Sequence, residues 1–256
     1  MMKRELEYFF AALRFFSRLP VPRWVGHTQD QLDHAARYFP LIGILIGGIG
    51  AGVTELVALA LPIGVAVLLG MAATLLATGA FHEDGFADSC DGFGGGWDKA
   101  QVLAIMKDSR IGSYAALGVG LVLLTKWNAL AELDAAFGPP LLALALVAGH
   151  AVSRLASTVL IFFLDYVRDD ASSRSKPLAQ RMAPHELGIA ALFGLAPCLL
   201  LPFTGVLVAL AAVALSTLLA ARYFLRRIGG YTGDCLGATQ QVSEIAFYLG
   251  LLCSFG

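Results

Sequence analysis

The chain has 256 residues, of which 57% are hydrophobic and only 14% are charged, and its formal net charge is −1. A soluble domain of this length has too little interior to bury that much apolar surface. The composition therefore excludes an ordinary soluble protein and predicts an all-α, polytopic membrane helix bundle. The small net charge says little about partners, and we expect no nucleic acid among them. The four cysteines lack CxxC spacing and fit neither a disulfide framework nor a structural zinc site.

The N-terminal segment 1–26 mixes lysine and arginine with aromatic residues. It lacks a continuous apolar core and a small-residue cleavage site, so it does not have the pattern of a cleaved signal peptide. Residues 5–19 are amphipathic and cationic. This pattern predicts an interfacial helix on the anionic inner leaflet of the membrane. The alternative is a short first span interrupted by arginines.

Apolar runs separated by proline and glycine follow along the rest of the chain. About 20 apolar residues are needed to cross roughly 30 Å of hydrocarbon. We predict seven spans within a single membrane-embedded domain, at residues 39–61, 62–81, 115–133, 140–164, 187–202, 204–222 and 242–255. Six spans are the alternative, because the last run is short and the 187–222 pair is open to a different division.

Lysine and arginine gather in the N-terminal segment and in three polar segments, 82–114, 165–186 and 223–241. The turns near 62, 134–139 and 203 contain none. With seven spans, every basic segment lies on one side of the membrane and every turn without basic residues on the other. The positive-inside rule then predicts that the N-terminus and the three polar segments are cytoplasmic.

The segment 82–98 concentrates carboxylates between a long apolar run and a glycine-rich stretch. Asp84, Asp88 and Asp91 are spaced i, i+4, i+7, which places them on one helical face, whereas Glu83 lies about 100° away and joins only from the flank. Like charges on one stripe demand a counter-ion. Oxygen ligands favour Mg²⁺ or Mn²⁺ over zinc. One metal with a general base and two metals both remain open, and a solvated acidic loop is the alternative.

Groups suited to a phosphate follow this segment. The run Gly94-Gly95-Gly96 is predicted to wrap an anion with backbone N–H groups, although a flexible turn would have the same sequence. Lys107 and Arg110 flank Asp108, and such basic residues neutralise charge that develops on phosphoryl oxygens. Arg110 has the geometry to clamp a phosphate bidentately.

A second polar, glycine-rich patch begins near residue 229 and lies on the same side by topology. Asp234 follows Gly233 there, which favours an acid that faces a ligand, and Thr232 and Gln240 are suitable hydrogen-bond partners. A plain glycine turn before the last span is the alternative.

Lys126 and Arg154 fall inside apolar spans, where each needs a partner or an aqueous cavity. Glu55 and Glu132 are the candidate partners. Arg154 shares a polar face with neighbouring His and Ser residues and is assigned to substrate binding. A purely structural ion pair is the alternative for both cations.

The residues from Phe81 to Gly92 (FHEDGFADSCDG) and from Ile105 to Gly112 (IMKDSRIG) resemble the cobalamin synthase family. Further matches lie at 16–22, 38–43 and 233–238, so the resemblance covers nearly the whole chain in order. Glu83 departs from the family pattern, in which an apolar residue is expected.

The resemblance implies an adenosylcobinamide-GDP ribazoletransferase of the bacterial inner membrane. The 5′-hydroxyl of α-ribazole, or of its 5′-phosphate, would attack the cobinamide-linked phosphorus and release GMP, with Mg²⁺ as cofactor. Asp84, Asp88 and Asp91 would hold Mg²⁺, and one of these carboxylates or Asp108 would accept the proton. Lys107 and Arg110 would stabilise the phosphoryl group, and Asp234 would close the site. Membrane lipid is a further expected partner, and a homo-oligomer or a complex with other late cobalamin-pathway enzymes is left open.

Three other functions compete with this one. A CDP-alcohol phosphatidyltransferase needs Asp-Gly-x-x-Ala-Arg, and here Ala87 is followed by Asp88 instead of an arginine. An intramembrane prenyltransferase would use similar diphosphate chemistry. A divalent-cation transporter would place its acids at mid-span rather than at a span end.

Overall fold

The computed structural model describes residues 2–26, 28–167 and 182–253. Within these ranges the regular structure is helical apart from one isolated bridge between Tyr166 and Tyr231. The all-α prediction is therefore confirmed. In chain order the elements are α1 (Met2–Phe16), α2 (Gln29–Ala35), η1 (Ala36–Tyr38), α3 (Phe39–Ala58), α4 (Ile63–Thr78), α5 (Phe81–Gly95), α6 (Lys99–Ile105), α7 (Ser113–Phe137), α8 (Pro139–Phe163), α9 (Pro184–Leu195), η2 (Ala196–Leu200), α10 (Phe203–Ile228) and α11 (Gly233–Cys253).

Within the described ranges, four helical stretches are long and apolar enough to cross a membrane: 29–58, which ends in α3, and α7, α8 and α10. The pair α4 and α5 adds a fifth if it is counted as one broken span, because its two halves meet at 89°. A helical membrane protein is thus confirmed, whereas seven separate spans remain a prediction. The run 187–202 is the short α9 with η2, and the run 242–255 is only the second part of α11.

The polar segments are more helical than the sequence indicates. Segment 82–114 forms α5, α6 and the start of α7, and segment 223–241 holds the end of α10 and the first half of α11. The predicted cytoplasmic segment 165–186 falls mostly on residues 168–181, which lie outside the described residues. These residues continue or begin packed helices, so 82–114 and 223–241 are not long connecting loops.

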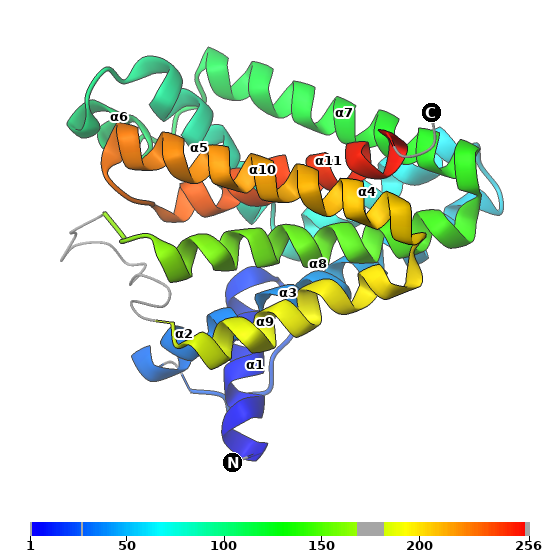
Figure 1. Cartoon of the computed structure of the whole chain (residues 1–256), viewed down its shortest axis with the longest axis horizontal. Helices are drawn as coiled ribbons and strands as arrows, with labels where there is room; N and C mark the ends of the chain where they lie inside the picture. Colours follow the sequence, from blue (N-terminus) through cyan, green and yellow to red (C-terminus); the bar gives the residue numbers. More distant parts are fainter. Residues whose placement is uncertain (1, 27, 168–181, 254–256) are drawn as a thin grey trace.

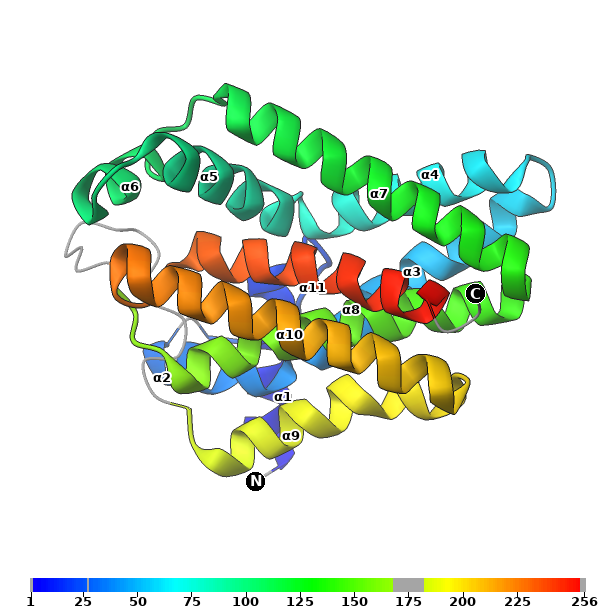
Figure 2. The same ribbon diagram turned by 45° about the horizontal axis from the view of Figure 1, so that its top comes forward.

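The long helices run side by side along the longest axis of the molecule, with α8 at the centre (Figures 1 and 2). Glycine allows the closest approach in this core, since a Cβ atom on Gly47 of α3 would lie 2.8 Å from the Leu146 carbonyl oxygen of α8. α11 packs against α10, α8 and α5, so it joins the acidic helix to the rest of the bundle.

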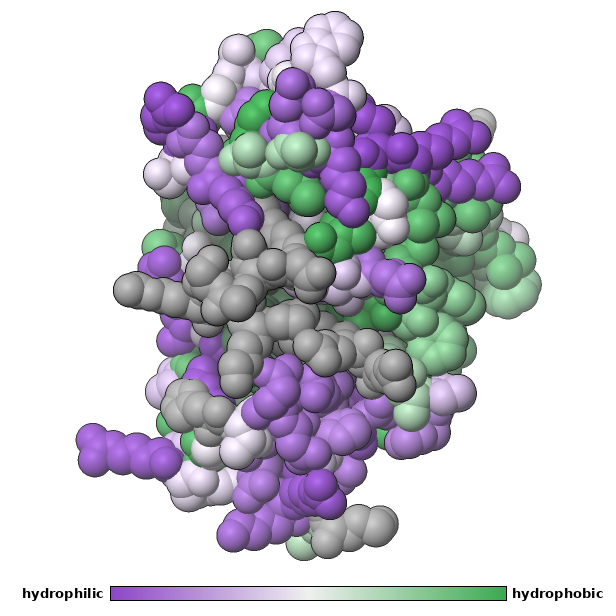
Figure 3. All heavy atoms as spheres, turned by 90° about the vertical axis from the view of Figure 1, so that its left-hand side faces the viewer, coloured by the Kyte–Doolittle hydropathy of each residue, from purple (hydrophilic) through white to green (hydrophobic). Residues whose placement is uncertain are grey.

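Helix α1 lies across the bundle at its edge rather than along it (Figure 1). On one face of α1, Leu13 and Phe16 are buried against the bundle. Elsewhere on the helix, Glu5 accepts hydrogen bonds from Arg37 at 3.2 Å. This is the form expected of an interfacial helix, although its place at a membrane surface stays a prediction. Hydrophilic side chains cover much of the bundle end that Figure 3 faces, and hydrophobic side chains gather on one flank.

Candidate functional site

The acidic segment forms helix α5, as the i, i+4, i+7 spacing predicts. Asp84 is exposed and Asp88 is half-buried one turn later. α5 does not continue α4 in a straight line, because Gly79 (φ 70°) and Ala80 (φ 58°) both adopt left-handed backbone conformations and the two helices meet at 89°. This bend lets α5 lie beside α11 instead of extending α4.

Glycine brings α5 into close contact with α11. A Cβ atom on Gly85 would lie 3.1 Å from the Asp234 Cα atom, and one on Gly237 would lie 2.9 Å from the His82 carbonyl oxygen. Thr232 caps α11, since its hydroxyl accepts the Cys235 N–H at 3.3 Å. The two polar patches, 150 residues apart in sequence, thus lie together. The roles of Asp234 and Thr232 in substrate binding stay predictions.

Asp91 has a structural task at the far end of the acidic stripe. Its carboxylate accepts the backbone N–H groups of Gly112 at 2.6 Å and Ala115 at 2.9 Å. These groups belong to the N-terminus of α7, where helix N–H groups lack partners and the helix dipole favours negative charge. Asp91 therefore caps α7 from 21 positions earlier in the chain. Its role as a metal ligand stays a prediction, and a metal ion would have to share the two oxygens that already accept these N–H groups.

The glycines after the stripe do not form an open loop. Gly94 and Gly95 lie in the last turn of α5, and the Gly96 N–H donates to the Gly92 carbonyl at 2.9 Å. The predicted wrapping of an anion by free N–H groups is therefore wrong, although substrate contact at Gly94 or Gly95 stays a prediction. Their small size serves packing, since a Cβ atom on Gly94 would lie 2.6 Å from the Tyr114 ring.

Arg227 fixes the end of the same helix. Its guanidinium donates to the Gly96 carbonyl at 2.7 Å and to the Phe93 carbonyl at 3.3 Å. A cation at a helix C-terminus satisfies unpaired carbonyls and complements the helix dipole. Sequence reasoning treated this arginine only as a positive-inside residue.

The Lys107-Asp108-Ser109-Arg110 segment joins α6 to α7 at the surface. The Arg110 side chain donates to the Asp108 carboxylate at 3.0 and 2.5 Å, and the Arg110 backbone N–H donates at 3.1 Å. These hydrogen bonds from Arg110 lower the pKa of Asp108 from 3.8 to about 2. Asp108 is therefore a weak proton acceptor while this pair is intact. The exposed Lys107 and Arg110 remain accessible to an anion.

Glu83 points into the bundle, away from the place that the sequence predicted. Its carboxylate accepts the Gln241 amide at 2.7 Å, and Gln241 in turn accepts the Lys126 ammonium at 3.1 Å. The second Glu83 oxygen is buried without a hydrogen-bond partner among the described residues. This geometry does not support Glu83 as a metal ligand beside Asp84.

Glu244 is the centre of a buried polar network. It pairs with Lys126 at 3.2 Å and accepts from Gln240 at 2.6 Å and from Tyr248 at 3.0 Å. The candidate partners Glu55 and Glu132 for Lys126 are therefore wrong. The pattern Gln240-Gln241-x-x-Glu244 in an otherwise apolar run was the available signal, and sequence reasoning missed it.

Arg154 belongs to the same network through His150, whose ring nitrogen lies 3.1 Å from the guanidinium. The Nε atom of Arg154 has no hydrogen-bond partner among the described residues. Arg154 and Gln240 are both buried and contact protein groups, so their predicted contact with substrate stays a prediction.

The donor set on α5 is compatible with magnesium. Across residues 2–26, 28–167 and 182–253, no three His, Cys, Asp or Glu side chains converge as a metal-binding group. Mg²⁺ does not need such a cage, because it usually takes one or two carboxylates and completes its shell with water and substrate phosphate. Asp84 and Asp88, one turn apart on the same face, meet that requirement.

Comparison with known proteins supports one family. The family model described as cobalamin-5-phosphate synthase matches residues 8–252. A protein of Shewanella frigidimarina named adenosylcobinamide-GDP ribazoletransferase is 51% identical over 249 residues, covering 97% of this chain and 95% of its own length. Proteins with the same name from Shewanella halifaxensis and Shewanella oneidensis are 45% and 47% identical, each covering at least 97% of this chain and 95% of its own length. No solved structure matches.

These matches run from α1 to the end of α11, and they include the acidic helix, the Lys-Asp-Ser-Arg segment and the start of α11. The chain belongs to the cobalamin-5-phosphate synthase family.

Proposed function

We propose that the chain is an Mg²⁺-dependent adenosylcobinamide-GDP ribazoletransferase. The observation that carries this proposal is the 51% identity, over 97% of the chain, to a protein of that name. The reacting hydroxyl would be the 5′-hydroxyl of α-ribazole or of α-ribazole 5′-phosphate. The products would be adenosylcobalamin, or its 5′-phosphate, and GMP.

The reaction is a displacement at phosphorus. A bond forms between the 5′-oxygen and the cobinamide-linked phosphorus, and the bond from that phosphorus to the bridging oxygen of the diphosphate breaks. GMP leaves with the bridging oxygen, and the hydroxyl proton passes to a base. Catalysis of such a transfer depends mainly on positioning and on neutralising charge.

Asp84 and Asp88 are the residues that would hold Mg²⁺. When bound, the ion would neutralise charge on the diphosphate oxygens. Lys107 and Arg110, which are exposed in the segment that joins α6 to α7, would receive the same phosphates. Asp234 approaches from α11 and would close the site on its other side. Because its pKa is low, Asp108 is a poorer candidate base than the α5 acids.

We also propose that this site faces the cytoplasm at the bacterial inner membrane. The support is the gathering of basic residues in the segments that carry Lys107, Arg110 and Arg227. Such residues remain on the cytoplasmic side of membrane proteins.

The direct test is GMP release by the purified protein from adenosylcobinamide-GDP and α-ribazole with Mg²⁺, with EDTA as control. We expect Asp88→Asn to lose about 10²-fold or more in turnover, the effect typical of removing a positioned catalytic group. Glu55→Gln, which changes an exposed carboxylate in the last turn of α3, is the matched control. Normal turnover in Asp88→Asn, or metal flux into proteoliposomes without GMP release, would contradict the proposal.

A further inference from the structure

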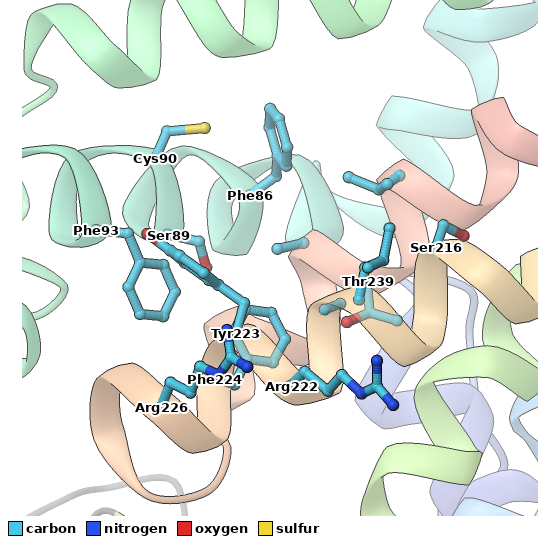
Figure 4. A pocket seen from close by; sticks show the side chains of 14 residues that line it. Phe86, Ser89, Cys90, Phe93, Ser216, Arg222, Tyr223, Phe224, Arg226 and Thr239 are labelled. Atoms are coloured by element: carbon cyan, nitrogen blue, oxygen red, sulfur yellow. The ribbon is translucent and has the colours of Figure 1, made fainter.

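A groove with a volume of about 670 Å³ opens between α5, α10 and α11. Aromatic rings from α5 and α10, those of Phe86, Phe93, Tyr223 and Phe224, line it together with aliphatic side chains (Figure 4). Leu219 is 55% exposed along this groove, so the cavity opens onto an apolar outer surface rather than into the protein core.

The groove is separate from the acidic face of α5. On a helix, side chains two positions apart are separated by roughly 200° around the axis, and side chains five positions apart by roughly 140°. Phe86 therefore projects away from Asp84, and Phe93 away from Asp88. A phosphate held at the acidic face would not enter this groove, so its occupant need not be a substrate of the proposed reaction.

Two arginines border the groove at the end of α10. Arg222 and Arg226 are exposed and lie one turn apart, on the same side of the helix. Neither side chain makes an ion pair or a hydrogen bond with another residue that the structure describes, in contrast to Arg227, which binds the carbonyls at the end of α5. The fold accounts for Arg227 and leaves the other two cations available to a ligand.

We propose that this groove binds an anionic phospholipid, with an acyl chain against the aromatic walls and the phosphate on Arg222 and Arg226. An apolar cavity on a lipid-facing flank, with two cations at one end, complements an acyl chain joined to an anionic headgroup. Guanidinium groups bind phosphate in planar, paired geometry. Each basic residue near an anionic leaflet adds an attraction equivalent to about fivefold in affinity.

Native mass spectrometry of the full-length protein in detergent tests the proposal. Phosphatidylglycerol and phosphatidylcholine with the same acyl chains are offered at equal concentration, and retained lipids are counted. We expect the wild type to retain phosphatidylglycerol preferentially, and the Arg222→Gln/Arg226→Gln variant to lose at least about tenfold in affinity. Lys3→Gln/Arg23→Gln, which removes two exposed cations elsewhere, is the matched control and should retain the lipid.

Two further variants separate the contribution of the headgroup contacts from the contribution of the apolar groove. Arg222→Lys/Arg226→Lys should keep most of the preference, because the charge remains. Ser216→Trp, which places an indole in the groove, should weaken retention of both lipids while the arginines are intact. Thermal unfolding with and without phosphatidylglycerol confirms that each variant is folded and should show lipid stabilisation only where the lipid is retained.

Several results would overturn the proposal. Equal retention of the two lipids by the wild type would do so, as would equal losses in the double variant and its control. Displacement of the lipid by glycerol phosphate would show that the site takes a soluble anion, and displacement by adenosylcobinamide-GDP would show that it belongs to the substrate. A dimer that lipid dissociates would identify the occupant as a second copy of the chain. None of these readouts depends on turnover, so they stand or fall separately from the proposed reaction.

Discussion

Asp84, Asp88 and Asp91 share a stripe in the sequence but do different work in the structure. Both carboxylate oxygens of Asp91 accept hydrogen bonds, from the backbone N–H groups of Gly112 and Ala115, whereas Asp84 is exposed. Helical spacing reports which residues share a face, but it does not report what a distant segment places against them. The division between the pair proposed to hold Mg²⁺ and a capping residue follows from tertiary contacts alone.

Asp91→Ala should destabilise the protein as well as slow it. Loss of a capping carboxylate at a helix N-terminus costs about 1 kcal/mol. We therefore expect a lower free energy of unfolding, measured in detergent, that Asp84→Ala, at an exposed position of the same stripe, does not share. If the two variants unfold alike and Asp91→Ala only abolishes turnover, then Asp91 acts as a ligand and the cap is unimportant.

The lowered pKa of Asp108 predicts how activity depends on pH. Asp108 is ionised above about pH 5 in both the folded and the unfolded chain, and the stability that its pair with Arg110 contributes is lost as pH falls from about 4 through about 2. The pH–rate profile of Asp108→Asn between pH 5 and 9 should therefore keep the shape of the wild type, even if the rate falls. An acidic limb that disappears in Asp108→Asn would identify Asp108 as the base.

The bend between α4 and α5 is the feature that places the acidic helix. Ala80 adopts a left-handed backbone conformation that costs a non-glycine residue about 1–2 kcal/mol. At Gly79 the same conformation is available to glycine, and a Cβ atom there would also collide with the Arg18 side chain. The bend is therefore held by packing against the N-terminal segment, where the Arg18 N–H donates to the Ala77 carbonyl at 2.7 Å.

Substitutions at the two bend residues should act in opposite directions. Ala80→Gly removes backbone strain and should raise the free energy of unfolding by up to about 1 kcal/mol. Gly79→Ala should lower it by more than that, because alanine is strained at this positive φ. Unfolding of both variants in detergent is the measurement. A stabilised Gly79→Ala variant would show that the bend is not formed.

The sequence predicted the kind of element well and its ends poorly. Apolar runs marked α3, α7, α8 and α10, and the i, i+4, i+7 spacing of the aspartates marked α5. No proline signals the bend at Gly79 and Ala80, because the constraint comes from Arg18, far away in the chain. α11 begins at Gly233 rather than 242, since its first half buries Gln240 and Gln241, which hydropathy counts as loop.

The buried network around Glu244 connects four helices: α5, α7, α8 and α11. Its charges lie among buried residues of the bundle, as a cation transporter would require, yet Lys126 and Glu244 pair with each other at 3.2 Å. Breaking a buried pair leaves an uncompensated charge, whereas removing both partners often costs little. The network therefore binds the helices together only as a complete set.

A double-mutant cycle tests this interdependence. Lys126→Met alone should destabilise the protein by about 3–5 kcal/mol. Lys126→Met/Glu244→Gln should cost less than the sum of the two single variants, since the unpaired acid is gone. Free energies of unfolding measured in detergent give the coupling. Strict additivity would mean that the pair contributes nothing as a pair.

The contact between Asp91 and Gly112 closes residues 91–112 into a ring whose two ends are pinned together. This ring carries α6, the exposed Lys107 and Arg110, and the half-buried Asp108. Val102 and Met106 are buried within it, and Arg227 of α10 binds the Gly96 carbonyl, so the ring is packed against the bundle as well as closed at its ends. A change of sequence between Asp91 and Gly112 therefore stays local to the ring. Gly112 itself has little room for a side chain, because a Cβ atom there would lie 2.5 Å from the Asp91 carboxylate.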